Sequence, residues 1–190
     1  MTHSTTSHPV TSHPTPAHPV TITRLSATTF DERVPGLADL LTDTVTGGSS
    51  LGFVTPFGRT EATAWWQAQR PAVADGTLDV WVADGPEGIT GMISLVHPAK
   101  PNARHRAEIV KLLVHRTARG QGLGRTLLTT AEQAAARSGF RLLLLDTETD
   151  SAADHLYRHA GWTPYGTVPS YAADPEGALR DCTFFYKEVG

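Results

Sequence analysis

The sequence predicts a single α/β domain built around one mixed sheet. Its 190 residues suit one domain, because a domain commonly holds roughly 100–200 residues. Strand-like and helix-like periodicities follow one another in the order β-α-α-β-β-β-α-β-α-β-β. Only one strand–helix–strand unit is strongly indicated, over residues 107–147, whereas a doubly wound parallel sheet would repeat that unit. The order therefore excludes both a Rossmann-type repeat and an all-β sandwich.

Composition and charge limit the function classes. Sixteen Lys and Arg residues stand against 19 Asp and Glu residues, which leaves a net charge of −3 with neutral histidine. This balance argues against nucleic acid or an anionic membrane as the main partner. The single cysteine excludes an internal disulfide and a cysteine-rich zinc site, and we expect no bound metal. The longest aliphatic run, Leu142–Leu145, is far shorter than the roughly 18 apolar residues of a membrane span. We therefore expect a soluble, cytoplasmic protein.

Residues 1–19 differ from the rest of the chain. They contain no Asp, Glu, Lys or Arg, and histidines recur at His3, His8, His13 and His18. Three of these precede proline, which disfavours a helix that would gather the imidazoles. A metal-chelating tract is one interpretation. A disordered extension is favoured, because so little apolar surface cannot offset chain entropy, and we place the domain at residues 20–190.

A strand and two helices are expected to open the domain. Residues 20–25 alternate in polarity like a half-buried strand. Apolar residues then recur at helical spacing, at Phe30, Val34, Leu37, Leu40 and Leu41. Asp31 and Glu32 are expected in the first turn of this helix, where carboxylates suit the helix dipole. A second helix is predicted over Glu61–Gln69, with Thr60 as its N-cap and Pro71 beyond its end.

Strands dominate the middle of the chain. Residues 78–83 and 89–96 flank a turn sequence, Asp84-Gly85-Pro86-Glu87-Gly88, and so predict a hairpin. Residues 107–114 form the next expected strand. The helix that follows carries a continuous apolar face and is expected to stop at Gly139.

The last third of the chain completes the predicted sheet. Arg141–Thr147 contains four consecutive leucines, which indicates a strand buried on both faces. Ser151–His159 is predicted as a short helix. Residues 162–167 and 183–187 are the last two expected strands.

A glycine-rich turn, Arg119-Gly120-Gln121-Gly122-Leu123-Gly124-Arg125, lies between strand 107–114 and the following helix. Glycines allow the backbone to approach a ligand closely, and the N–H groups at a helix start favour an anion such as pyrophosphate. The flanking arginines add charge-assisted contacts. A P-loop is excluded because no Gly-Lys-Ser/Thr follows, and Leu127 stands where a dinucleotide motif would have its last glycine.

Two segments resemble the GCN5-related N-acetyltransferase (GNAT) superfamily. Lys111–Gly124 is similar to its central Arg/Gln-x-x-Gly-x-Gly/Ala motif after a strand, and Ser151–Trp162 to its Ala-x-x-Leu/Phe-Tyr-x-x-x-Gly-Phe/Trp box. The resemblance covers about residues 20–188. It implies the GNAT fold, with a mostly antiparallel sheet of about seven strands, about four helices and splayed central parallel strands.

A narrower resemblance points to a bacterial subgroup that includes the tabtoxin resistance acetyltransferase. It is carried by five segments, Glu108–Leu112, Leu145–Glu148, Val168–Ala172, Asp174–Leu179 and Phe185–Lys187. The subgroup includes enzymes that acetylate antibiotics.

The superfamily resemblance implies acetyl-CoA as the donor and an amine as the acceptor. The residues it assigns to coenzyme binding are Leu112, Leu113, Val114, Arg119, Gly120, Gln121, Gly122, Leu123, Gly124, Arg125, Asp150 and Ala153. Backbone groups of Leu113 and Val114 would pair with the pantetheine arm as with an added strand. Asp150 or Ser151 stands where the family often has Asn, which puts one coenzyme contact in doubt.

Three residues are the expected catalytic groups. Tyr157 occupies the family's tyrosine position, from which its phenol could protonate the leaving thiolate. Glu108 and Asp146, on neighbouring strands, could remove a proton from an acceptor that is mostly an ammonium ion at neutral pH. The rival bases are His97, His105 and His115, each at a strand end or turn. Cys182 is not expected to be a nucleophile, because the family transfers the acetyl group directly.

The acceptor is expected to meet Trp65, Trp66 and Tyr171, together with the loop 47–58 and an insertion over 169–179. Helical geometry turns one of the two tryptophans toward the core. The favoured function is N-acetylation of a small-molecule amine, such as an amino-acid-like antibiotic or toxin in self-resistance. The alternatives are a protein or peptide N-acetyltransferase and a catalytically silent CoA-binding regulatory domain. Dimers are frequent in the family, and the sequence leaves the oligomeric state open.

Overall fold

The computed structural model describes residues 20–86 and 88–190. The expected tail at residues 1–19 lies outside this range. One sheet of seven strands, in the order β1-β2-β3-β4-β5-β7-β6, forms the centre of the described chain. The strands are β1 (Thr21–Arg24), β2 (Leu78–Gly85), β3 (Gly88–Val96), β4 (Arg106–Val114), β5 (Leu142–Glu148), β6 (Thr163–Ala173) and β7 (Leu179–Glu188).

Five α-helices accompany the sheet in the described residues, one more than expected. They are α1 (Ala27–Thr46), α2 (Arg59–Ala68), α3 (Arg70–Ala74), α4 (Leu123–Arg137) and α5 (Ala152–His159). The additional helix is the short α3, which contains Pro71 in its first turn. Pro71 was expected beyond the end of the second helix, and it indeed follows α2, but it starts a further helix, because proline is well tolerated at a helix start, where its missing N–H is not needed.

Two predicted helix starts were wrong. Helix α1 begins at Ala27 behind the N-cap Ser26, so Asp31 and Glu32 lie beyond its first turn. Helix α2 takes Gly58 as its N-cap in place of Thr60, and Glu61 accepts a hydrogen bond from the Gly58 N–H. In both helices a short local hydrogen bond decides the start, which hydrophobic periodicity does not report.

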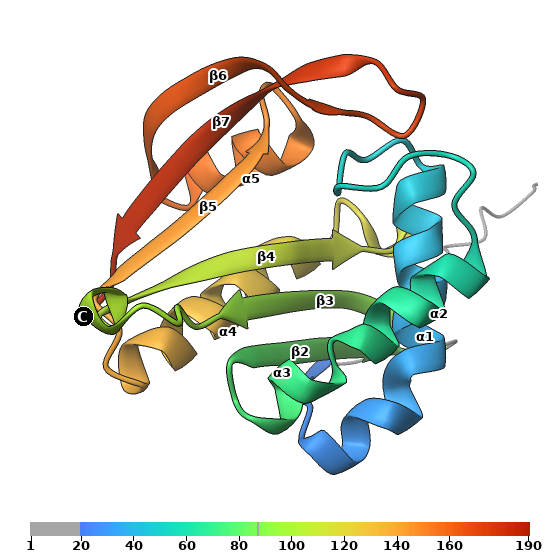
Figure 1. The fold of residues 1–190 in the computed structure, drawn as a ribbon, viewed down its shortest axis with the longest axis horizontal. Helices are drawn as coiled ribbons and strands as arrows, with labels where there is room; N and C mark the ends of the chain where they lie inside the picture. The colour runs from blue at the N-terminus through green and yellow to red at the C-terminus, as the bar shows by residue number, and fades with distance from the viewer. Residues whose placement is uncertain (1–19, 87) are drawn as a thin grey trace, which may run out of the picture.

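The sheet divides between β4 and β5 (Figure 1). This is its parallel pair, and the ladder covers only Arg106 to Glu108, opposite Leu142 to Leu144. Every other neighbouring pair is antiparallel. Beyond Glu108 the two strands diverge, which confirms the GNAT fold with splayed central strands.

Apolar residues on both faces of the sheet hold the helices in place. One cluster joins α1, α2 and α3 to Val80, Val82 and Met92. The other joins α4 and Tyr157 of α5 to Leu143, Leu145 and Phe185. Figure 1 shows α1 to α3 on one face of β2–β4 and α4 on the other. This packing fixes the two edges of the gap between β4 and β5.

None of the helices among the described residues is both long and apolar enough to cross a membrane.

Candidate active site

Two adjoining cavities lie where β4 and β5 diverge. We call the larger, of about 400 Å³, the glycine-turn cavity, and the smaller, of about 290 Å³, the Tyr157 cavity. Both are lined by Ser50, Leu51, Leu112, Thr147, Glu148 and Ala153. The cavities are therefore parts of one slot that runs between the two parallel strands.

The turn between β4 and α4 requires glycine at two positions. Gly120 and Gly122 have φ angles of 75° and 80°, in the left-handed region that other residues rarely adopt. Gly122 is also the N-cap of α4. The first N–H groups of a helix have no partner within it, so the start of α4 offers hydrogen-bond donors and a positive dipole end to an anion in this cavity.

Most of the expected coenzyme-binding residues line the glycine-turn cavity. These are Leu112, Val114, Arg119, Gly120, Gly122, Leu123, Gly124, Arg125 and Ala153. Three do not. The Leu113 side chain is 1% exposed and packs in the core. The side-chain amide of Gln121 donates to the Thr117 carbonyl. The backbone N–H of Asp150 donates to the Asp154 carboxylate.

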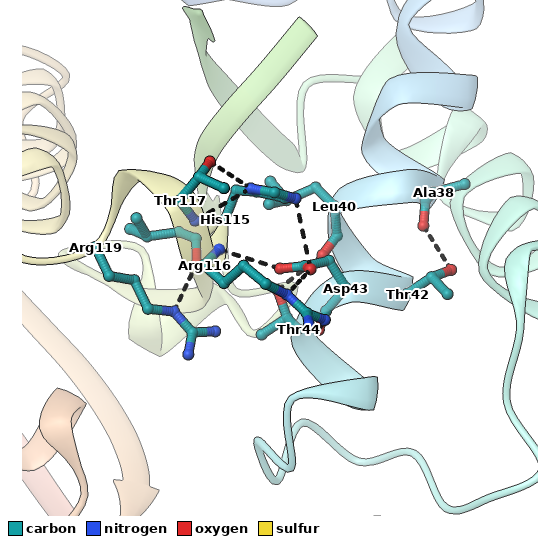
Figure 2. A network of polar contacts seen from close by, with 10 residues as sticks. Ala38, Leu40, Thr42, Asp43, Thr44, His115, Arg116, Thr117 and Arg119 are labelled. Atoms are coloured by element: carbon teal, nitrogen blue, oxygen red, sulfur yellow. Dashed lines mark hydrogen bonds and ion pairs between the residues drawn. The ribbon is translucent and has the colours of Figure 1, made fainter. Parts of the chain in front are cut away.

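A polar network fastens the turn to the end of α1 (Figure 2). The Asp43 carboxylate pairs with the Arg116 guanidinium and accepts from the Arg116 N–H at 3.2 Å. His115 lies 3.5 Å from the same carboxylate. The Arg119 Nε–H donates to the Val114 carbonyl at 3.1 Å, and this bond does not use the two terminal nitrogens of the guanidinium. Because α1 also leads into loop 47–58, one carboxylate couples the loop to the glycine turn.

The Tyr157 cavity contains the expected acid. Tyr157 is 5% exposed, with its ring between Trp162 and Phe185 at centroid distances of 5.9 and 6.0 Å. Burial raises the pKa of its phenol, and the charge of Asp146 adds to the shift. The hydroxyl therefore keeps its proton at neutral pH and can donate it.

The two expected carboxylates lie close together on one face of the sheet. Glu108 is paired with Leu144, and Asp146 follows two residues further along β5. Partial burial raises the pKa of the Glu108 carboxyl, and the Asp146 charge raises it further. Asp146 lines the Tyr157 cavity, whereas Glu108 lies just outside it, where the strands still pair.

The rival histidines lie outside both cavities. His97 contacts Asp79 at 3.1 Å and packs on Phe140. His115 belongs to the network around Asp43. His105 precedes β4, at the opposite end from the glycine turn.

Comparison with known proteins identifies the family. A family model described as "Acetyltransferase (GNAT) family" matches residues 49–162, more than half of the chain. The chain belongs to the GNAT family. An uncharacterized N-acetyltransferase in the hisH-hisA intergenic region of Azospirillum brasilense is 36% identical over 112 residues, which cover 58% of this chain and 65% of that protein. The chain thus matches less than two thirds of that relative's length.

Solved GNAT structures share the fold. A phosphinothricin acetyltransferase from Sinorhizobium meliloti, solved in complex with AcCoA, has a TM-score of 0.73 and 20% identity, with 90% of this chain and 89% of that chain covered. A ribosomal-protein-alanine N-acetyltransferase from Brucella melitensis has a TM-score of 0.71 and 24% identity, with 89% and 99% covered.

The three residues expected to contact the acceptor lie in three different environments in this GNAT chain. Tyr171 lines the Tyr157 cavity and is 52% exposed. Trp66 is 0% exposed, and its indole N–H donates to the Leu37 carbonyl at 3.1 Å, so its assignment to the substrate was wrong. Trp65 lines neither cavity and instead packs on Phe53 and Lys111.

Sequence reasoning missed two side chains of the Tyr157 cavity. The Cys182 thiol donates to Asp146 Oδ2 at 3.2 Å and to the Thr147 carbonyl at 3.1 Å. Burial and the bond to Asp146 raise the pKa of this thiol to about 12, so it stays a hydrogen-bond donor. Lys111 lines the cavity at a distortion of β4. A lysine among the apolar residues of a strand was the available signal for it.

Proposed function

We propose that the chain is an acetyl-CoA-dependent N-acetyltransferase that transfers an acetyl group to the amine of a small molecule. The observation that carries this proposal is the slot between β4 and β5, which joins an anion-binding helix start to a cavity holding an acid and a carboxylate. Family membership supports the same reaction, and acetyl-CoA is bound in the Sinorhizobium meliloti relative.

The glycine-turn cavity fits the coenzyme. A Cβ added at Gly120 or Gly122 would meet nothing within 4 Å, so the backbone there borders open space that side chains would fill. At Gly124 a Cβ would lie 3.4 Å from Leu156, which keeps this side of the cavity narrow. We assign the pyrophosphate to the N–H groups at the start of α4, with Arg119 and Arg125 flanking it.

The reaction needs three proton transfers and one exchange of bonds. The acceptor ammonium first loses a proton to the carboxylate pair of Asp146 and Glu108, which passes it to water. The neutral amine attacks the thioester carbonyl, a C–N bond forms, and the C–S bond breaks as Tyr157 gives its phenolic proton to the departing thiolate. The acylated nitrogen then loses its second proton to the tyrosinate, which restores the Tyr157 phenol and leaves the amide and coenzyme A with a free thiol.

The acceptor class follows from the Tyr157 cavity. About 290 Å³ is of the size of small-ligand sites, and three carboxylates from Asp146, Glu148 and Asp181 favour a cationic amine. The phosphinothricin acetyltransferase relative favours an amino-acid-like acceptor and, with the subgroup resemblance, a resistance role. The Brucella melitensis relative favours the second candidate, a protein N-terminus as acceptor.

Thiol release with a panel of acceptors tests the proposal. The full chain is incubated with acetyl-CoA and either small amines or peptides, and the acetylated product is identified by mass. Release that depends on small amines is expected. Acetylation of peptides but not of small amines would contradict the proposal and support a protein or peptide N-acetyltransferase. If coenzyme A binds but no acceptor releases thiol, the chain is a binding domain and the proposal is wrong.

A further inference from the structure

The ionisable side chains of the Tyr157 cavity are unevenly paired. They are Lys111, Arg180, Asp146, Glu148 and Asp181. Arg180 contacts Asp174 at 2.9 Å and Glu148 at 4.0 Å. Within the described residues, neither Lys111 nor Asp146 has an oppositely charged partner within 4.0 Å. Among the described residues, the cavity thus presents one cation, Lys111, and two anions, Asp146 and Asp181, that are not neutralised by an ion pair.

Lys111, one of the residues that line the Tyr157 cavity, lies in a distorted stretch of β4. The pairing of β3 with β4 shifts register between Met92 and Ser94, opposite residues 110–113. Lys111 lies in this bulge with a φ of 54°, a conformation uncommon for a residue with a side chain. Such local strain costs free energy and is concentrated at functional sites.

The surroundings of Lys111 satisfy only part of its hydrogen-bonding capacity. Its ammonium donates to the Leu51 carbonyl at 2.9 Å and lies over Phe53 and Trp65, 5.5 and 5.4 Å from the ring centroids. An ammonium has three donors, and one is used here. Burial lowers the pKa of Lys111, against the opposing charge of Asp146, so an anionic partner would relieve the cost of burying the charge.

We propose that Lys111 binds an anionic group of the acceptor, so that the preferred acceptor carries a carboxylate near its amine. This inference rests on the proposed function. The amine lies at Asp146, and the carboxylate receives a charge-assisted hydrogen bond from Lys111. Lys111 and Asp146 line the same cavity without pairing with each other, so each is available to the opposite charge of one zwitterionic acceptor.

The acceptor itself provides the first test. Wild-type enzyme is assayed with L-phenylalanine, L-methionine and L-glutamate, and with the α-amide of each. The amide keeps the amine and side chain but lacks the negative charge. A charged hydrogen bond contributes about 1.5–3 kcal/mol, so kcat/KM should favour the acid roughly 10–100-fold. Equal or better use of the amides would overturn the proposal.

Substitution of Lys111 provides the second test. In Lys111→Met the ratio of kcat/KM for the acids to kcat/KM for the amides should fall toward one, mainly because KM for the acids rises. Lys111→Arg keeps the positive charge and should restore part of the preference for the acids. Lys100→Met is the matched control, since this exposed lysine lies outside both cavities and removes the same charge. A merely structural Lys111 would lower activity with acids and amides alike and leave the ratio unchanged, which contradicts the proposal.

The two proposals fail in different ways. If wild-type enzyme releases no thiol with any amine, the proposed function is wrong. If it acetylates amines without regard to the carboxylate, the function stands and only the role of Lys111 is wrong.

Discussion

Tyr157 shows how burial decides the role of a single residue. The tyrosine is closed in by two aromatic rings, which removes water and keeps its phenol protonated. Asp146 contacts the Cys182 thiol, whose raised pKa lets it donate to the carboxylate. A protonated acid and a carboxylate thus lie in one cavity, as amide formation needs.

Tyr157→Phe should lower kcat by about 10²–10⁴-fold, the usual contribution of a general acid. The ring keeps its packing against Trp162 and Phe185, so coenzyme affinity and thermal stability should stay near the wild-type values. Thiol release, calorimetric binding of acetyl-CoA and thermal unfolding check these points. Tyr165→Phe is the matched control, because Tyr165 is 58% exposed and lies outside both cavities. Turnover equal to wild type would refute the acid role.

The pH dependence of activity should report Glu108. Its pKa is raised by burial and by Asp146, and a base works only when deprotonated, so kcat/KM should rise with pH through a value above the ordinary carboxyl range. Glu108→Gln should remove this acidic limb and lower the plateau. If kcat/KM of Glu108→Gln still rises with pH as in the wild-type enzyme, the titrating group is not Glu108. The measurement is kcat/KM against pH at constant ionic strength.

At the scale of elements, the start of α4 depends on one backbone conformation. Gly122 closes the turn with a φ of 80° and caps the helix, so the first N–H groups of α4 face the glycine-turn cavity. Asp43 holds the preceding residues against α1. The turn is therefore fixed at both ends before any ligand binds.

Gly122→Ala should destabilise the fold by about 1–2 kcal/mol, the cost of a left-handed residue with a Cβ. It should also weaken acetyl-CoA binding, because a change in the turn conformation would displace the backbone N–H groups assigned to the pyrophosphate. Gly76→Ala imposes similar strain at φ 75°, away from both cavities, and serves as the control. Denaturant unfolding and calorimetry separate the two effects. Equal coenzyme affinity in both variants would remove the turn from the binding site.

At the scale of the whole molecule, the described part of the site draws on residues far apart in the chain. The residues lining the two cavities run from Thr44 to Cys182 and come from both halves of the sheet. Exposed apolar side chains gather on β6 and β7, including Tyr165, Val168 and Leu179. A homodimer, which is frequent in the family, is one candidate assembly, and the oligomeric state stays open.

Deleting residues 1–19 should leave kcat and KM unchanged, since every residue assigned to the site follows Thr44. Steady-state thiol release by the full and shortened chains makes the comparison. A loss of activity that returns when the segment is restored would assign the histidine-rich stretch a part in function.

The sequence by itself determined the family, the element order apart from the short helix α3, and most of the glycine-turn cavity. These depend on local patterns: periodicity marks the strands and helices, and the turn's glycines and arginines are consecutive. Helix starts at Ala27 and Arg59 were less well predicted, because local capping bonds decide them.

Only the tertiary structure decided what faces the acceptor. Trp66 lies in the core while its neighbour Trp65 packs on Lys111, a choice made by the contacts of α2 with α1. Lys111 lines the Tyr157 cavity where β4 bulges, and Cys182 contacts Asp146 because β7 pairs with β5. Such contacts join residues far apart in the chain and depend on strand register, which no local pattern specifies.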